Sequence, residues 1–224
     1  MPSPDGCPRG GGGLLRYVAP VGLDAELTEY YDAEARAGLR GELDPMRLEI
    51  RRRYLDALRA EHRRTVIDVG SGPGRDTVAF HHDGFAVIGV DLAPANISAL
   101  CSHGPAGVTA SLYGLPFRTS SFEALWTMST FVHVPHHRFD EAMTELLRVV
   151  VPGAPMAIGT WGGQDYEGVP EFGELRPYRF FSLASHERWR SMLERHGDIE
   201  DFVTYPPTRP SGWEYQYALI RRDE

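Results

Sequence analysis

One segment constrains the fold of this chain more than any other: a short apolar run that ends in a glycine-rich turn. The segment is Val66-Ile67-Asp68-Val69-Gly70-Ser71-Gly72-Pro73-Gly74-Arg75-Asp76. Glycine tolerates positive φ and lets a ligand approach the backbone without meeting a Cβ. A helix that starts after the turn presents unpaired N–H groups and the positive end of its dipole. The order of strand, turn and helix therefore predicts a ligand-binding turn at one edge of a sheet.

The rest of the chain alternates short apolar runs with amphipathic segments. We expect strands at residues 65–69, 85–90, 107–110, 122–127, 155–160, 199–205 and 213–221. Helical patterns lie between most of them, at residues 75–83, 94–102, 137–151 and 185–196. Strands separated by helices imply right-handed crossovers and a parallel sheet, whereas the last two strands are joined directly. The sequence predicts an α/β, Rossmann-like, doubly wound fold, with a mainly parallel seven-stranded sheet and a C-terminal antiparallel hairpin.

The composition excludes several classes of function. A formal net charge of −8 disfavours DNA and RNA as partners, because phosphate-binding surfaces need clustered basic residues. All 23 basic residues are arginines, so no lysine is present to form a Schiff base or a P-loop. No stretch approaches the ~18 apolar residues of a membrane span, and the first residues lack a signal-peptide pattern. Cys7 and Cys101 fit no metal or disulfide framework. We expect a cytoplasmic protein that binds no metal.

Two carboxylates flank the glycine turn in a way that indicates an adenosine cofactor. Asp91 ends the second predicted strand, where an acid accepts hydrogen bonds from ribose hydroxyls. The third glycine, Gly74, comes one residue earlier than in the G-x-G-x-x-G turn of dinucleotide sites. Asp68 stands just before the turn, where its charge repels a diphosphate and suits a cationic amino acid tail. The spacing and the charge both point away from a nicotinamide dinucleotide.

Five ordered motifs resemble those of class I S-adenosylmethionine-dependent methyltransferases, in particular the small-molecule branch of the type 11/25-like families. They are Asp68-Val-Gly70-Ser-Gly72-Pro-Gly74, Val90-Asp91-Leu92-Ala93-Pro94, Leu115-Pro116-Phe117 with Ser121-Phe122-Glu123, Phe131-Val132-His133-Val134-Pro135, and Val149-Val-Val-Pro152-Gly153-Ala154. The resemblance covers about residues 65–160 and implies S-adenosyl-L-methionine as cofactor, with S-adenosyl-L-homocysteine as product.

The resemblance also implies roles for individual residues. It assigns the methionine end of the cofactor to Asp68, Gly70, Ser71, Gly72 and Gly74, the ribose to Asp91, and the adenine to Leu92. Backbone groups of Thr127 and Met128 would bind the methionine amine, and Tyr31, in a "YYDAEA" run, would fold over the cofactor. Ser111 stands where the family usually has an aspartate that accepts from the adenine amino group, so Leu112 backbone is an alternative contact.

The acceptor side is less constrained by the sequence. His133 is the expected general base, with a pKa near neutrality. Aromatic residues suit both a sulfonium and a substrate ring, and core packing is the alternative for each of them. Tyr30, Tyr31, Tyr17 and Trp126 are possible walls for the sulfonium, and the expected substrate-binding residues are Tyr17, Tyr30, Trp161 and Tyr178.

We divide the chain into a flexible N-terminal arm at residues 1–22 and one domain at residues 23–224. Within the domain, residues 23–62 form a helical cap, residues 65–160 the cofactor-binding core and residues 161–183 a substrate loop. Seven arginines lie in residues 47–64, at the end of the cap and just after it. They could form a solvated helix face, or they could contact an anion or RNA.

Three hypotheses about function follow. The first is a methyltransferase that modifies an O, N or C atom of a small molecule, for example in secondary metabolism. The second is a tRNA or protein methyltransferase, and the third is a non-catalytic protein that binds the cofactor. The expected assembly is a monomer or a homodimer.

Overall fold

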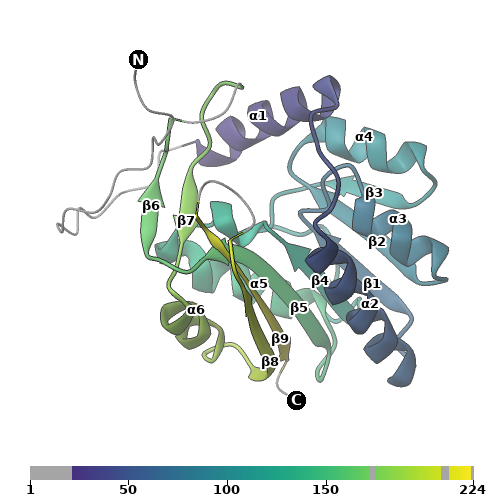
Figure 1. The fold of residues 1–224 in the computed structure, drawn as a ribbon. Helices are drawn as coiled ribbons and strands as arrows, with labels where there is room; N and C mark the ends of the chain where they lie inside the picture. Colours follow the sequence, from purple (N-terminus) through teal and green to yellow (C-terminus); the bar gives the residue numbers. More distant parts are fainter. Residues whose placement is uncertain (1–21, 172–174, 208–211, 223–224) are drawn as a thin grey trace.

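A seven-stranded sheet in the order β3-β2-β1-β4-β5-β9-β8 forms the centre of the protein (Figure 1). The computed structural model describes residues 22–171, 175–207 and 212–222. The first five strands along the chain are parallel, and β9 runs antiparallel to both of its neighbours. The strands are β1 (Thr65–Val69), β2 (Ala86–Asp91), β3 (Ala106–Thr109), β4 (Ala124–Met128), β5 (Pro155–Gly162), β8 (Asp198–Tyr205) and β9 (Glu214–Arg221). The predicted fold class is confirmed.

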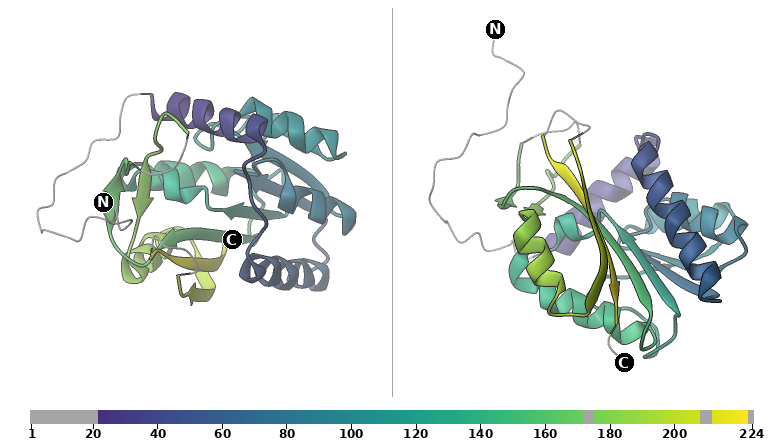
Figure 2. Two further views of the ribbon diagram at one scale, coloured as in Figure 1. Left: turned by 45° about the horizontal axis from the view of Figure 1, so that its top comes forward. Right: turned by 60° about the horizontal axis from the view of Figure 1, so that its bottom comes forward.

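Helices cover both faces of the sheet, as the two views of Figure 2 show. One face carries α2 (Pro45–Ala60), α3 (Arg75–His82) and α4 (Pro94–Ser102), and the other carries α5 (Phe139–Val149) and α6 (His186–Leu193). The 3₁₀ turns η1 (Phe131–His133) and η2 (His136–Arg138) lead into α5. The remaining helix, α1 (Leu23–Ala37), lies across the carboxyl ends of the strands (Figure 1). None of the described helices combines the length and the apolar character needed to cross a membrane.

The core consists of two apolar layers because successive strand residues point to opposite faces. Val66 and Trp126 pack in the layer beneath α2 and α3, whereas Ile67 and Leu125 pack in the layer beneath α5 and α6. Tyr54 of α2 is fully buried, and its hydroxyl donates to the carbonyls of Leu125 and Pro155. Helices therefore pack on both faces of the strands. This packing fixes the carboxyl end of β1, where the glycine turn begins.

The segment expected to be a loop at residues 161–183 contains regular structure. β6 (Tyr166–Gly168) and β7 (Phe181–Leu183) form a two-stranded antiparallel sheet beside the main one. Three residues are too few to display the alternation that marks a strand, which explains why the sequence pattern missed both. The expected N-terminal arm lies outside the described residues, except for Gly22, which precedes α1 with φ 106°.

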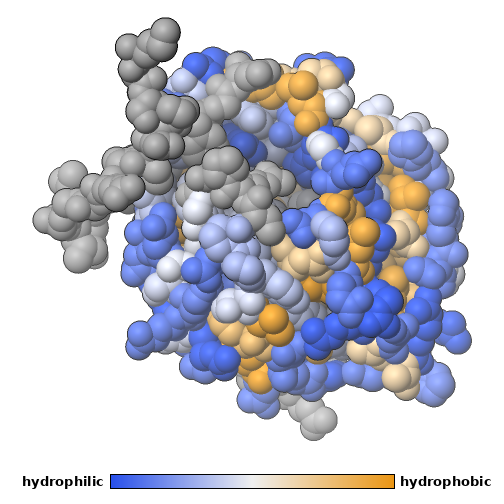
Figure 3. Space-filling model, in the orientation of Figure 1, coloured by the Kyte–Doolittle hydropathy of each residue, from blue (hydrophilic) through white to orange (hydrophobic). Residues whose placement is uncertain are grey.

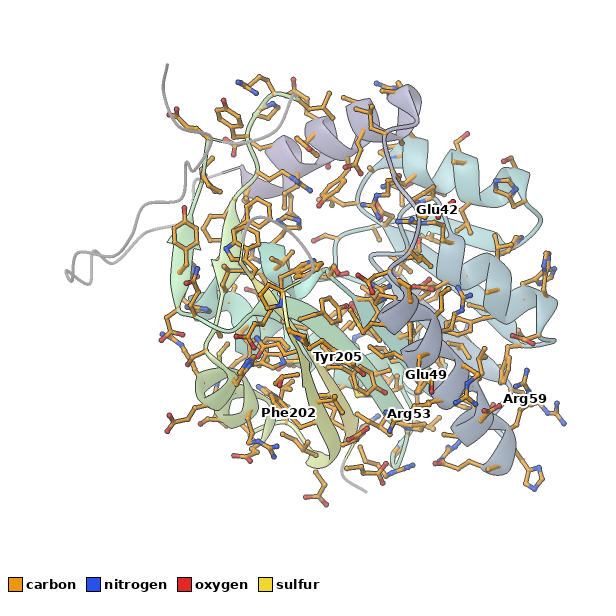
Figure 4. All side chains as sticks on the ribbon, viewed as in Figure 1. Glu42, Glu49, Arg53, Arg59, Phe202 and Tyr205 are labelled. Carbon is orange, nitrogen blue, oxygen red and sulfur yellow. The ribbon has the colours of Figure 1, made fainter. Side chains whose placement is uncertain are left out.

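The outer face of α2 is rich in charge, and its arginines are paired. All five arginines of α2 form ion pairs with carboxylates, namely Arg47, Arg51, Arg52, Arg53 and Arg59, and so does Arg63 just after the helix. Figure 4 labels Arg53 and Arg59 along this helix, with Phe202 and Tyr205 on neighbouring β8. The same face in Figure 3 is mainly hydrophilic, with separate hydrophobic patches. Because these arginines are paired with carboxylates, the surface of α2 is a charge-balanced helix face. This favours the solvated helix face over an anion or RNA contact.

Candidate active site

A cavity of about 550 Å³ lies at the carboxyl edge of the sheet, beneath α1. It extends from the ends of β2 and β3 past β1 and β4 to β5 and β9, in the order in which these strands lie in the sheet. The strand order reverses direction between β1 and β4, and open α/β sheets bind ligands at such a point. Asp68 and Asp91 both line this one cavity.

Helix α1 forms the roof of the cavity and is fixed at both ends. Leu23 and Leu27 pack with Phe180, which precedes β7. Further along the helix, the Asp32 carboxylate accepts a hydrogen bond of 2.7 Å from the backbone N–H of Ala95, in the first turn of α4. The connection from α1 to α2, where Figure 4 labels Glu42, also lines the cavity.

The glycine turn is held by its own hydrogen bonds. The N–H groups of Gly70 and Ser71 donate to the carbonyl of Val90, and that of Gly74 donates to Ser71. Gly70 has φ 75°, and a Cβ placed on it would lie 1.9 Å from Oγ1 of Thr130. Since these N–H groups face inward, the turn does not present the row of free donors that cradles a diphosphate. Its geometry agrees with the exclusion of a dinucleotide.

Asp91 ties the turn to the start of α4. One carboxylate oxygen accepts from Gly72 N–H at 2.7 Å, and the other accepts from Ala93 N–H at 2.9 Å and from Asn96 Nδ2 at 3.0 Å. An ionised carboxylate has about four acceptor positions. Protein donors occupy three of them, so one position remains for a hydroxyl of a ligand.

Asp68 is a buried carboxyl group without a basic partner at hydrogen-bond distance among the described residues. Within the described part of the chain, its one side-chain hydrogen bond comes from the Thr77 hydroxyl, at 2.6 Å. Burial and the neighbouring Asp76 raise the pKa of Asp68 to about 8. Asp76, in contrast, is ion-paired with both Arg47 and Arg51. Asp68 therefore lacks the cation that its charged form needs, and a cationic ligand group in the cavity would supply it.

His133 and Tyr31 form a polar pair on the acceptor side of the cavity. Nδ1 of His133 lies 2.7 Å from the carbonyl oxygen of Phe180, which accepts only, so that Nδ1 carries the proton. Nε2 is then an acceptor, and the Tyr31 hydroxyl donates to it at 2.5 Å. Burial, together with the charges of Arg179 and Arg40, lowers the pKa of His133 to about 3. The expected near-neutral pKa is therefore wrong, because the imidazole is desolvated among cations.

The structure brings most of the predicted site residues to this cavity. The predicted residues that line it are Tyr31, Asp68, Gly70, Ser71, Asp91, Leu92, Ser111, Leu112, Met128, His133 and Trp161. Gly72, Gly74 and Thr127 lie behind the lining, and a Cβ on Gly74 would collide with Leu100 of α4. Thr127 is fully buried within β4.

The remaining aromatic predictions have different outcomes. Tyr30 and Tyr178 do not line the cavity: Tyr30 is a buried residue of α1, and the ring centre of Tyr178 lies 3.6 Å from Cζ of Arg176. Trp126 is a core residue whose Nε1 donates to Asp76. Tyr17 lies outside the described residues. Of the described residues, no three His, Cys, Asp or Glu side chains are grouped so that they could hold a metal ion.

Several lining residues escaped the sequence analysis because distant contacts place them, and three of these have polar or aromatic side chains that bear on the chemistry. Asp24 of α1 accepts a hydrogen bond of 2.8 Å from the Ser111 hydroxyl, so a carboxylate lies beside the position where the resemblance led us to expect one. Arg179 donates to the Tyr31 hydroxyl at 3.1 Å. Trp213, before β9, joins Trp161, Phe181 and Tyr215 in an aromatic wall at the acceptor end. The sequence carried two signals: the serine at position 111, and the position of Arg179 within the expected substrate loop at residues 161–183.

Two comparisons with known proteins agree with this arrangement. Residues 67–158 match the family model of a methyltransferase domain. A 2-methyl-6-phytyl-1,4-hydroquinone methyltransferase from Synechocystis is 32% identical, and the match covers 69% of this chain and 58% of that protein. Over its central residues the chain resembles methyltransferases. It spans just over half the length of this methyltransferase relative, and 43% of an uncharacterised one from Mycobacterium tuberculosis that is 35% identical.

Solved methyltransferase structures share the fold. The 1,6-didemethyltoxoflavin-N1-methyltransferase of Burkholderia thailandensis, with 1,6-didemethyltoxoflavin and S-adenosylhomocysteine bound, matches with a TM-score of 0.69. The match covers 93% of this chain and 92% of that one, at 18% identity. A geranyl diphosphate C-methyltransferase from Streptomyces coelicolor, also with S-adenosylhomocysteine, has a TM-score of 0.56 and 16% identity over 71% of this chain and 69% of its own.

Proposed function

We propose that this protein transfers a methyl group from S-adenosylmethionine to a small molecule with a ring. The observation that carries the proposal is the position of Asp68, Asp91 and His133 around one cavity. When bound, the cofactor supplies a methyl group already activated for displacement by its sulfonium. The work left to the protein is to orient the acceptor and to exclude water, which lowers the barrier by up to ~7–11 kcal/mol.

The residues at the cofactor end fit S-adenosylmethionine. Asp68 lacks a cationic partner, and the methionine amine is a cation of suitable size for that position. Asp91 has one acceptor position left for a ribose hydroxyl. The Ser111–Asp24 pair provides the acceptor that the adenine amino group requires. Leu92, which lines the same cavity, would offer an apolar surface to the adenine.

On the acceptor end, the Tyr31–His133 pair handles the proton. Because Nδ1 is bonded to Phe180, only Nε2 can take a proton, and Tyr31 already points its hydroxyl at that atom. A proton leaving an O–H or N–H acceptor passes to the Tyr31 oxygen as the tyrosine proton passes to His133. Because the pKa of His133 is about 3, the imidazole is a weak base, so the relay should contribute less than the factor of about 10²–10⁴ given by a general base whose pKa lies near the working pH.

Three observations favour a small molecule over tRNA or protein. The cavity lies beneath α1, its acceptor end is lined by aromatic rings, and the arginines of α2 are ion-paired. The relatives named above act on a hydroquinone and on 1,6-didemethyltoxoflavin.

In this proposal residues 23–62 are the cap, residues 65–160 the cofactor core and residues 161–183 the substrate segment. A cytoplasmic location and a monomeric or homodimeric state remain predictions from the sequence.

A ligand titration tests the proposal. S-adenosylmethionine or S-adenosylhomocysteine at about 100 times its Kd should stabilise the native protein by about 2.7 kcal/mol, which raises the melting temperature by about 5–10 °C. NADH at the same concentration serves as the matched control and should leave the melting temperature unchanged. If neither S-adenosylmethionine nor S-adenosylhomocysteine raises the melting temperature, the proposal is wrong. A mobility shift with tRNA that persists in a salt series would favour the second hypothesis.

A further inference from the structure

Arg179 is a cation without a carboxylate partner among the described residues, and it lines the acceptor end of the cavity. Its Cζ lies 4.3 Å from the ring centre of Tyr30, 5.1 Å from that of Phe181 and 5.5 Å from that of Tyr31. Three aromatic rings therefore surround the guanidinium. They stabilise its charge and fix its position, but they do not neutralise it.

Two of the other arginines of the cavity have a carboxylate partner: Arg40 pairs with Glu34 at 2.7 Å, and Arg47 pairs with Asp76 at 2.7 Å. Arg75 donates to the carbonyl of Gly41 and has no carboxylate partner among the described residues, but it directly follows the glycine turn at the cofactor end. Arg179 has one hydrogen bond among the described residues, from Nη1 to the Tyr31 hydroxyl. A guanidinium carries five N–H donors in a planar fork, so four of its donors are free for an anionic oxygen.

The two ends of the cavity therefore differ in their ionisable groups, with carboxyl groups at one end and an arginine at the other. Asp68 and Asp91 lie at the cofactor end, and Arg179 lies beside the Tyr31–His133 pair at the acceptor end. A cationic cofactor and an anionic acceptor would each meet the opposite charge. Because Arg179 directly precedes Phe180, whose carbonyl holds His133, its charge lies next to the proposed proton relay.

We propose that Arg179 binds an acidic oxygen, a phenolate or a carboxylate, of a planar aromatic acceptor. This inference rests on the proposed function and names the substrate class for the same cavity. The rings of Trp161, Phe181 and Trp213 supply the surface on which the aromatic ring lies, and the guanidinium sets its orientation. Specificity follows from charge, since an uncharged ring of the same shape leaves the arginine unpaired.

The test uses the full chain saturated with S-adenosylhomocysteine and a panel of aromatic acids, each with its matched amide. Benzoate, 4-hydroxybenzoate and 2-naphthoate are compared with benzamide, 4-hydroxybenzamide and 2-naphthamide by calorimetry. We expect at least one acid to bind about 10-fold or more tighter than its amide, because a charge-assisted bond is lost in the amide. R179Q removes this difference, and R179K, which keeps the charge, retains a preference for the acid.

Controls separate this inference from the proposed function. R190Q is the matched control, because Arg190 stacks on Phe202 at 4.4 Å on exposed α6, outside the cavity. It should keep the preference for the acid. Equal binding of acid and amide, binding of no acid at all, or an undiminished preference in R179Q would overturn the inference. A loss of S-adenosylhomocysteine affinity in R179Q would place Arg179 on the cofactor and also overturn it, whereas failure of the wild type to bind that ligand would contradict the proposed function.

Discussion

The hydroxyl oxygen of Tyr31 lies 2.5 Å from Nε2 of His133, although the two residues are 102 positions apart in the chain. The contact joins the roof helix α1 to the turn after β4. The carbonyl of Phe180 holds the other side of the imidazole, so the ring has one defined tautomer. Three segments that are distant in sequence thus determine which nitrogen is free to accept a proton.

This arrangement predicts the protonation of His133. With its pKa lowered to about 3, the imidazole stays neutral, with Nδ1 protonated, at every pH above about 4. Nitrogen NMR of labelled protein should report that tautomer at pH 5. R179Q should raise the pKa, because it removes a nearby positive charge. A His133 signal that titrates near pH 6.5 in the wild type would contradict the prediction.

The same pKa predicts a change of stability with pH. The folded-state pKa of His133 lies below its unfolded value of about 6.5, so the native state binds fewer protons than the unfolded state between these values. The contribution of His133 to the free energy of unfolding is therefore present above pH 6.5 and is lost as the pH falls toward 3. In urea unfolding, the free energy of unfolding of H133Q should fall less than that of the wild type between pH 6.5 and pH 3.

Asp68 predicts the opposite behaviour. Its folded-state pKa of about 8 lies above the unfolded value, so the free energy of unfolding without ligand falls as the pH rises from about 4 to about 8. A cationic ligand binds the ionised form, so the affinity for S-adenosylmethionine should increase between pH 6 and pH 8, by up to about tenfold per pH unit. D68N should bind more weakly, with a flatter pH profile. Calorimetric titrations at pH 6, 7 and 8 measure both effects.

The Ser111–Asp24 pair predicts a substituted adenine contact. Removal of a charged hydrogen-bond partner costs about 1.5–3 kcal/mol, so D24N should weaken S-adenosylhomocysteine binding by about 10–150-fold. S111A should have a similar effect, and the double variant should be little worse than either one, because both act on one contact. The inosine analogue of the ligand, which lacks the amino group, should bind D24N and wild type alike. Additive losses in the double variant would argue against a shared contact.

Alanine substitutions at two glycines distinguish the cost of backbone strain from the cost of a steric collision. Gly70 and Gly84 both have positive φ, of 75° and 87°, but a Cβ on Gly84 meets nothing within 4 Å. G84A should cost about 1–2 kcal/mol of unfolding free energy, which is the price of a left-handed alanine. G70A should cost clearly more and should also weaken ligand binding, because its Cβ would collide with Thr130. Equal losses in urea unfolding would show that the close approach to Thr130 is not needed.

Much of the fold follows from the sequence because its signals are local. The apolar run 65–69 and the helix 94–102 coincide with β1 and α4, since short buried strands and a proline at the first helical turn have strong local patterns. The antiparallel pair at the C-terminus was predicted because no helix separates its strands. β6 and β7 were missed because they are held by each other and by the roof, not by a pattern of their own.

The candidate site also contains some residues that the sequence could place and others that it could not. Asp68 and Asp91 follow strands directly, so the sequence alone places them at the same edge of the sheet. Arg179 and Asp24 reach the cavity only through contacts that join residues 148 and 87 positions apart. The pKa of His133 could not be predicted either, because it depends on burial and on arginines that tertiary folding brings near it.

The roof helix α1 contacts both ends of the cavity: Asp24 meets Ser111 at one, and Tyr31 meets His133 at the other. Because one helix carries a contact to each end, a substitution that displaces α1 should weaken the binding of cofactor and acceptor together. The packing of Leu27 on Phe180 is one place where such a displacement would start.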